Sequence, residues 1–487
     1  MKIINSINEA VLEKTAQRCR ERGIVIPTFA QMLDPVGRVP QAIKDRLKRV
    51  GLWDVDPLNL FRITWKNEPV EHGGGFNEGN WLEFPPALTG VPARIVGLVG
   101  RHFPTGAHKV GAAFGCLVPR LVSGTFDPTT QKAVWPSTGN FCRGGAYDCA
   151  LLGCTAVGIL PEQMSRERFE WLRGIGAEVI ATPGCESNVK EIYDKCWEIR
   201  RTRPDCVIFN QFEEFGNAIW HYHVTGKTIG EIFGRLAGPR DRLAGFVSAT
   251  GSAGTIAAGD YLRTIAPHVR IAAAEALQCP TLLQCGFGAH RIEGIGDKHI
   301  PWIHNVRNTD VVIAIDDEQT MALMRLFNEP EGRSLLVREG VPEELTGRLD
   351  LLGISSLCNL AAAIKLARHF EMDGRDVIFT PLTDSMDLYG SRLEEQRALH
   401  GPYTSVQAAA HMARYLHGIG TDYMRELTFA DRKALHNFKY FTWVEQQGRT
   451  AEDLRRLWDP DFWTETFAQA EEWDRLIEQF NARVGLG

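Results

Sequence analysis

The segment Gly245-Phe-Val-Ser-Ala-Thr-Gly-Ser-Ala-Gly-Thr255 joins an apolar run to a loop of glycine and hydroxyl residues. Residues 245–249 have the composition of a buried strand, and a helix is expected to begin near Gly254. Such a junction presents unpaired N–H groups at the positive end of a helix dipole, which suits a phosphate dianion. Many turns of this kind are glycine-rich for conformational reasons alone. The segment therefore predicts a strand–loop–helix unit and only weakly indicates a phosphate site.

Similar units recur on both sides of this segment. Short β-rich runs alternate with helical runs from about residue 93 to residue 380, which is typical of parallel sheets covered by helices on both faces. A chain of 487 residues can bury two such cores. We expect an N-terminal extension (1–92), a smaller α/β domain (93–215), a larger α/β domain (216–400) and a helical, aromatic-rich C-terminal extension (401–487).

The composition is that of an ordinary globular protein. A net charge of -6 without a long basic run argues against nucleic acid or a membrane surface as a partner. The 11 cysteines include no C-x-x-C pair and no zinc-like spacing, so we expect thiols in a reducing compartment and no metal site. Neither a signal peptide nor an apolar stretch of about 20 residues is found, which predicts a cytoplasmic protein.

Lys109 lies in Arg101-His-Phe-Pro-Thr-Gly-Ala-His-Lys109-Val-Gly-Ala-Ala, a loop that opens into a helix of small apolar residues. Most lysines are solvated, but this setting indicates a desolvated amine with a lowered pKa, nucleophilic enough for Schiff-base chemistry. The turn Ser137-Thr-Gly-Asn140 follows; it is either a capped helix start or a donor to a phenolate-like oxygen. A lysine, a polar turn and a phosphate loop in this order indicate a site for pyridoxal phosphate.

Longer segments make the pattern specific. Residues 210–229, 288–301, 353–356 and 383–389, together with the lysine, asparagine and glycine loops, resemble the cysteine synthase / cystathionine β-synthase family. This family contains pyridoxal phosphate enzymes of fold type II, which are similar to the tryptophan synthase β subunit. The resemblance implies an α/β fold of two three-layer α/β/α domains with mostly parallel sheets, and a cofactor in the cleft between them.

The resemblance also implies roles for single residues. Lys109 would form the imine with the cofactor and remove the substrate Cα proton, and Asn140 would bind the ring hydroxyl. Ser385 would face the pyridine nitrogen, with Thr383 as the alternative, whereas Asp384 aimed there would protonate the ring. The cofactor phosphate is assigned to Gly251, Ser252, Ala253, Gly254 and Thr255. The substrate is assigned to Ser137, Thr138, Gly139, Phe141, Gln211 and Gly294.

The chain also departs from the family pattern. Phe141-Cys142 replaces the threonine and glycine of typical cysteine synthases, and Ala107 replaces a serine. The segment 288–301 carries extra charged or polar residues that either are solvated or recognise a second polar group: Arg291, Glu293, Asp297, Lys298 and His299.

The resemblance implies β-replacement on a small β-substituted amino acid through an aminoacrylate. Elimination to a keto acid and ammonia, and a non-catalytic cofactor-binding relative, stay open as alternatives. A homodimer is expected.

Overall fold

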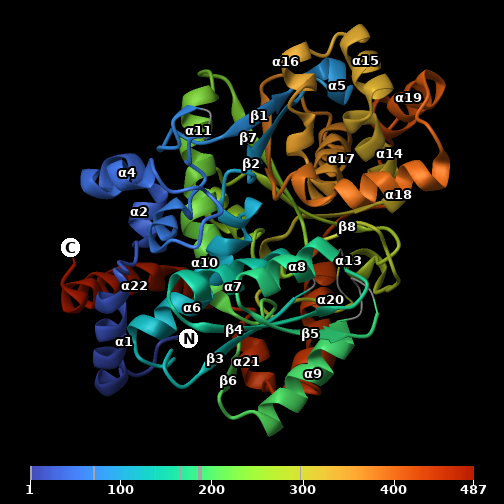
Figure 1. Ribbon diagram of the computed structural model, residues 1–487. Coiled ribbons are helices and arrows are strands. Elements are labelled where there is room, and N and C mark those ends of the chain that lie inside the picture. Colours follow the sequence, from blue (N-terminus) through green and yellow to red (C-terminus); the bar gives the residue numbers. More distant parts are fainter. Residues whose placement is uncertain are drawn as a thin grey trace.

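The structure, a computed structural model, describes residues 3–69, 72–137, 139–164, 166–184, 189–296 and 298–486. It contains two sheets flanked by helices (Figure 1). The larger sheet has the strand order β1 (Trp81–Phe84), β2 (Arg94–Val99), β10 (Asp376–Leu382), β7 (Arg242–Ala249), β8 (Arg270–Ala276), β9 (Val311–Ile315) and β11 (Met424–Glu426). The smaller sheet has the order β5 (Glu178–Thr182), β4 (Thr155–Pro161), β3 (Lys132–Pro136) and β6 (Cys206–Ile208).

Both sheets are built mainly from parallel strands. All pairs in the smaller sheet are parallel, as are the pairs from β2 through β10, β7 and β8 to β9. Only the outer strands β1 and β11 are antiparallel to their neighbours. The alternation of strands and helices in the sequence thus predicted the fold class correctly.

Sheet membership differs from the expected segments at three strands. Strand β2 falls in the segment expected to form the smaller domain, yet it pairs with β10 in the larger sheet. Strands β1 and β11 belong to the expected N- and C-terminal extensions, and each extends one edge of the same sheet. Both extensions are therefore continuous with the larger sheet.

The helices follow the alternation of the sequence. The helices that precede β6 in the sequence are α1 (Glu9–Arg22), α2 (Phe29–Leu33), α3 (Pro35–Arg38), α4 (Gln41–Leu47), α5 (Pro86–Thr89), α6 (Lys109–Val122), α7 (Asn140–Leu151), α8 (Arg166–Gly174) and α9 (Val189–Thr202). Those of the larger domain are α10 (Phe215–Trp220), η4 (His221–Gly226), α11 (Lys227–Leu236), α12 (Ala257–Ile265), α13 (Thr281–Gln284), α14 (Asp317–Asn328), α15 (Pro330–Arg338), α16 (Glu343–Thr346), α17 (Ile354–His369) and α18 (Gly390–His400). The C-terminal extension contains α19 (Ser405–Met412), η8 (Ala413–His417), α20 (Phe429–Lys439), η9 (Tyr440–Val444), α21 (Ala451–Arg456) and α22 (Pro460–Val484). Short η turns complete the chain at Pro57–Arg62, Pro104–Gly106, Val306–Asn308, Leu349–Leu351 and Met386–Leu388.

Helices α6 and α10 cross at two glycines. A Cβ atom on Gly115 would lie 2.3 Å from the carbonyl oxygen of Gly216, and one on Gly216 would lie 2.1 Å from that of Gly115. The two backbones thus touch directly, which any larger residue would prevent. Because α6 begins at Lys109, this crossing fixes where the lysine stands relative to the larger domain.

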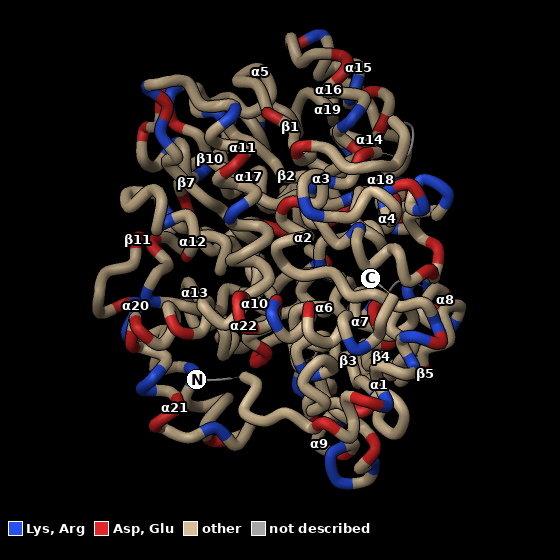
Figure 2. Tube along the Cα trace, turned by 90° about the vertical axis from the view of Figure 1, so that its left-hand side faces the viewer, with Lys and Arg blue, Asp and Glu red and all other residues tan. Residues whose placement is uncertain are grey.

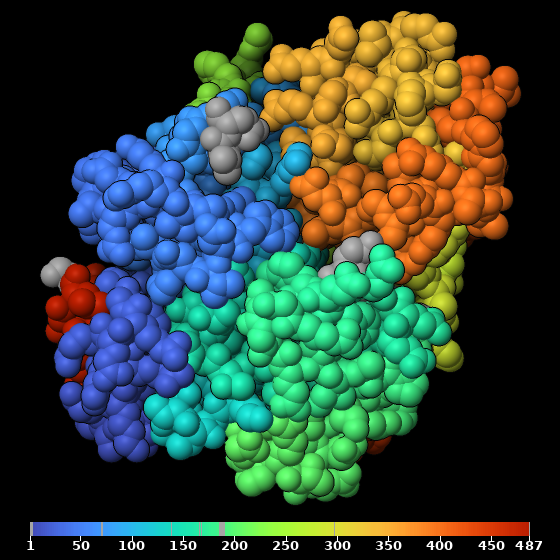
Figure 3. Space-filling model, in the orientation of Figure 1, coloured from blue at the N-terminus to red at the C-terminus, as the bar shows by residue number. Residues whose placement is uncertain are grey.

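The two ends of the chain pack together. Helix α22 lies beside α1 (Figures 1 and 3), and Arg483 of α22 pairs with Glu9 of α1 at 2.5 Å. The rings of Phe29 and Trp473 lie 5.9 Å apart in the core beneath. Much of the aromatic C-terminal extension is therefore core, as expected for such a segment.

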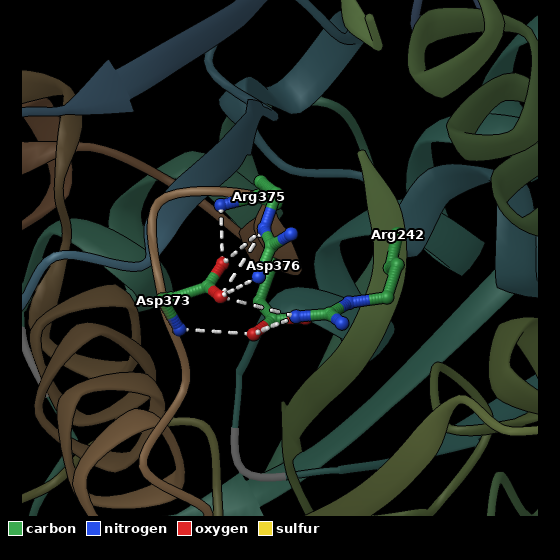
Figure 4. Close-up of polar contacts among 4 residues, drawn as sticks. All are labelled: Arg242, Asp373, Arg375 and Asp376. Atoms are coloured by element: carbon green, nitrogen blue, oxygen red, sulfur yellow. Dashed lines mark hydrogen bonds and ion pairs between the residues drawn. The ribbon is translucent and has the colours of Figure 1, made fainter. Parts of the chain in front are cut away.

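Polar interactions tie the larger sheet together at the end where β7 and β10 begin. The guanidinium of Arg242 donates from Nε and one terminal nitrogen to the two carboxylate oxygens of Asp376, at 2.7 and 2.9 Å (Figure 4). Arg375 holds the pKa of Asp373 below its usual range by hydrogen bonding. These residues mark the strand starts, whereas the candidate site lies at the opposite, carboxyl end.

Charged residues of both signs are spread along the chain. Figure 2 shows lysine and arginine interspersed with aspartate and glutamate along the trace. Within the described ranges, no helix is both long enough and apolar enough to cross a bilayer.

Candidate active site

Lys109 is the first residue of α6, which follows the glycine-containing turn Pro104–Gly106. Its Nζ donates to Ser252 Oγ at 3.1 Å. Burial lowers the pKa of the ammonium from 10.5 to about 8. About a tenth of the amine is then deprotonated at pH 7, far more than for an ordinary lysine, and the deprotonated form is the one that acts as nucleophile or proton acceptor.

The glycine loop lies between the carboxyl end of β7 and the start of α12. Ala253 adopts a φ of +61°, unusual for a residue with a side chain. A Cβ on Gly254 would lie 1.9 Å from Asn217 Oδ1, so only glycine fits. Asn217, which belongs to α10, also donates through Nδ2 to Ser252 Oγ at 3.0 Å and thereby holds the loop in place. The loop has the strand–loop–helix setting that the sequence predicted.

The predicted residues converge on one small cavity between the two sheets. Gln211 donates from Nε2 to Ser137 Oγ at 3.1 Å across it. Its lining consists of Lys109, Ser137, Gly139, Asn140, Phe141, Gln211, Phe212, Gly251, Ser252, Gly294, Ile295, Gly296 and Thr383. Ala253, Gly254 and Thr255 continue the loop behind this lining. Thr138, also predicted to bind substrate, lies outside the described residues.

The residues after β10 are arranged differently from the first assignment. The hydroxyl of Ser385 donates to Asp387 Oδ2 at 3.0 Å, and Ser385 is not part of the cavity lining. Thr383, the alternative, lines the cavity. Asp384 turns toward Asn140, whose Nδ2 donates to its Oδ2 at 2.6 Å. The sequence motif located this segment. Which of its residues, Thr383 or Ser385, faces the cavity depends on the path of the chain after β10.

Two histidines behind the phosphate loop did not stand out in the sequence. The rings of His108 and His221 lie 4.9 Å apart, and His221 Nε2 is 3.5 Å from Thr255 Oγ1. Burial lowers the pKa of His108 to about 3 and that of His221 well below its ordinary value. Both imidazoles are therefore neutral. His221 Nδ1 lies 2.9 Å from the Thr225 hydroxyl, whereas neither nitrogen of His108 has a hydrogen-bond partner among the described residues. The sequence signal for the two histidines was their position next to the lysine and in the segment 210–229.

Two of the charged side chains on the loop that faces the cavity take part in internal pairs. Glu293 pairs with Arg168 at 2.9 Å and with Arg392 at 2.5 Å. Arg291 pairs with Asp317 at 2.6 Å. The solvated-loop alternative therefore does not describe the buried Glu293.

The two remaining described positions of this loop contact aromatic rings. His299 Nε2 lies 2.8 Å from the hydroxyl of Tyr193, which belongs to α9 beside the smaller sheet. Lys298 lies over the ring of Phe287 at 5.9 Å. Asp297 lies outside the described residues.

The cavity has the donor set that pyridoxal phosphate needs. Lys109 offers an amine for the aldehyde, and residues 251–255 offer hydroxyls and backbone N–H groups for the phosphate. Asn140 lines the cavity and uses one N–H of its Nδ2 in the bond to Asp384, which leaves the other N–H for an acceptor on a ligand. The residues present therefore fit this cofactor.

Comparisons with known proteins agree with this assignment. Residues 99–340 match the model of a family described as pyridoxal-phosphate dependent enzyme. The chain is 31% identical over 287 residues to cysteine synthase B of Campylobacter jejuni, which covers 59% of this chain and 86% of the relative. It is 30% identical over 230 residues to a probable cysteine synthase of Bacillus subtilis, which covers 47% of this chain and 72% of the relative.

A solved structure shares the fold. The O-acetylserine-dependent cystathionine β-synthase of Helicobacter pylori superimposes with a TM-score of 0.54 at 24% identity, and the match covers 64% of this chain and 94% of that one.

The chain is thus a pyridoxal-phosphate-dependent enzyme of fold type II. Within that class, it belongs to the family of the cysteine synthases and cystathionine β-synthases.

Proposed function

We propose that this enzyme replaces the β-substituent of a small amino acid, such as an O-substituted serine, with a nucleophile. The observation that carries the proposal is the meeting of Lys109, Asn140 and Ser252 at one cavity, with Lys109 Nζ 3.1 Å from Ser252 Oγ. The cysteine synthase relatives support this reaction class.

The residues of the cavity have different roles in the proposed reaction. Lys109, whose pKa is lowered to about 8, holds and releases the proton at the substrate Cα atom. Ser137 and Gln211, joined by a hydrogen bond of 3.1 Å, bind the substrate carboxylate together with Thr138 and Gly139, which follow Ser137 in the sequence. Phe141 and Gly294 bound the space for the substrate side chain. Pyridoxal phosphate, when bound, supplies the electron sink for charge at Cα.

Thr383 takes the place first assigned to Ser385. It lines the cavity directly after the carboxyl end of β10, which supports a contact between its hydroxyl and the pyridine nitrogen. A hydroxyl there leaves the nitrogen unprotonated and the cofactor a moderate electron sink. That property favours loss of a β-substituent over transamination.

A spectrum and a product analysis test the proposal. Purified protein with pyridoxal phosphate should absorb at about 410 nm, as expected when a lysine amine is joined to the cofactor's aldehyde, and Lys109→Ala should lose this band. O-acetylserine with a thiol should give a thioether, and without thiol no pyruvate. Pyruvate release in the absence of thiol would instead identify the elimination alternative, and a protein that takes up no cofactor would exclude an active enzyme.

A homodimer in the cytoplasm is part of the same proposal. Exposed rings of the C-terminal extension, Phe429, Phe438 and Phe441, support association with a second copy. Light scattering that gives the mass of one chain, about 54 kDa, would refute the dimer.

A further inference from the structure

A hydrogen bond between the two domains reaches the cofactor-facing amide. Asn140 starts α7 beside the smaller sheet, whereas Asp384 follows β10 of the larger sheet. Asn140 Nδ2 donates to Asp384 Oδ2 at 2.6 Å, and the hydroxyl of Tyr389 donates to the same oxygen at 2.7 Å. Asp384 and Tyr389 are both buried. The bond therefore links a helix beside the smaller sheet to the segment that follows a strand of the larger sheet.

The Asp384 carboxylate is closely confined. A Cβ on Gly353 would lie 1.9 Å from Asp384 Oδ1, and the Gly353 N–H donates to the Asp384 carbonyl at 3.0 Å. Burial raises the pKa of Asp384, while the bonds from Tyr389 and Asn140 and the charge of Arg168 oppose this rise. The charge of Glu293 adds to the rise, so the net shift of the pKa is upward. Oδ2 nevertheless accepts from both Tyr389 and Asn140.

This arrangement decides how the Asn140 amide is turned. Asp384 Oδ2 already accepts from the Tyr389 hydroxyl, so the amide must present its donor, Nδ2, to the same oxygen. The flipped amide would place Oδ1 against Oδ2, two acceptors with no proton between them. Nδ2 carries two N–H groups, and Asp384 uses one, which leaves the other for an acceptor in the cavity that Asn140 lines.

We propose that Asp384 is a positioning residue that orients the Asn140 amide toward the ring hydroxyl of the cofactor. This inference rests on the proposed function, because it assumes that Asn140 faces pyridoxal phosphate. Asp384 itself does not line the cavity and acts through Asn140.

The test measures cofactor binding by the full-length apoprotein rather than activity. Asp384→Asn keeps the size of the side chain and removes its charge, so that either amide orientation becomes possible. We expect its Kd for pyridoxal phosphate to rise about fivefold or more, and the pH midpoint of the bound cofactor's visible band to shift. In an Asn140→Ala background, the same substitution should change the Kd less than about twofold, because the residue through which it acts is gone.

Tyr389→Phe is the matched control. It removes the other donor to the same oxygen and keeps the charge, so its Kd should stay within about twofold of the wild type. If Asp384→Asn does not fold, as judged by its Tm, Asp384→Ser replaces it as a smaller acceptor without charge.

The outcomes separate the two proposals. Asp384→Asn with an unchanged Kd and band, while Asn140→Ala binds weakly, would overturn the role of Asp384. Effects of Asp384→Asn and Asn140→Ala that multiply would overturn it as well, because Asp384 would then act independently of Asn140. If Lys109→Ala and Asn140→Ala both left cofactor binding and the visible band unchanged, the proposed function itself would fail.

Discussion

Lys439 is a fully buried lysine without a carboxylate partner among the described residues. Its Nζ donates to the carbonyl oxygens of Trp302 and His304, at 3.0 and 2.7 Å. Burial lowers its pKa from 10.5 to about 7. Because the unfolded chain binds this proton more tightly, the charged lysine opposes folding at low pH, and the opposition fades as pH rises from about 7 to about 10.5.

The magnitude follows from linkage. A difference of 3.5 pKa units between 10.5 and about 7 corresponds to about 5 kcal/mol over the whole window. Between pH 7 and about 8.5 the wild type should therefore gain about 1.5 kcal/mol of unfolding free energy from this residue. Lys439→Met abolishes that gain, although it also leaves two carbonyls unpaired at roughly 1–3 kcal/mol each.

Urea unfolding of both proteins at the two pH values measures this difference. The unfolding free energy of the wild type should rise with pH more than that of Lys439→Met, by about 1.5 kcal/mol. Lys48→Met is the control, since the Lys48 side chain is 58% exposed and its removal should leave the pH dependence unchanged. Identical pH dependence in wild type and Lys439→Met would refute the reasoning.

Four further predictions concern residues that support the fold or the site. Gly115→Ala should lower the unfolding free energy by roughly 1–3 kcal/mol or more and reduce cofactor uptake, because its Cβ would lie 2.3 Å from the Gly216 carbonyl oxygen; calorimetry and cofactor absorbance measure both effects. Gly234→Ala in α11, where no atom lies within 4 Å of the added Cβ, should instead stabilise the protein by about 0.5–1 kcal/mol, and a loss comparable with that of Gly115→Ala would contradict the steric argument. Asn217→Ala removes the 3.0 Å bond to Ser252 and should weaken pyridoxal phosphate binding about tenfold in a titration of the apoprotein; an unchanged Kd would show that Asn217 does not fix the loop. Arg242→Gln breaks the pair with Asp376 at the far end of the sheet, so it should lower Tm slightly, less so at about 1 M salt, and leave cofactor binding unchanged; altered binding would show that this pair is coupled to the site.

The strands and the site loops were predictable because their signals are local. The runs that form β3, β4 and β9 are continuous and apolar, and the glycine loop follows β7 without interruption. The sequence did not reveal which sheet each strand joins. Residues 94–99 read as a strand, but pairing with β10, about 280 residues later, is a tertiary fact with no signature in the strand itself. Strand β11 spans only Met424–Glu426 and has no apolar alternation that would reveal it.

Within the site, the sequence located loops more reliably than single side chains. Lys109 and Asn140 each begin a helix, so their positions follow from the helix starts. Thr383, Asp384 and Ser385 follow a strand in an irregular path, where adjacent side chains point in different directions. Asp384 is the clearest case: its role depends on Asn140, 244 positions away, and on the space left by Gly353.

The C-terminal extension lies outside residues 99–340, which match the family model, yet it supports the site. Trp443 of η9 donates to the carbonyl oxygen of Ile300 at 2.8 Å, and Lys439 binds the next carbonyls at Trp302 and His304. These three carbonyls belong to the segment that leads directly out of the loop facing the cavity. Buried carbonyls must be paired, so the C-terminal extension supplies donors that the catalytic core lacks at this point. The loop near the substrate therefore owes part of its conformation to residues far beyond the core of the family.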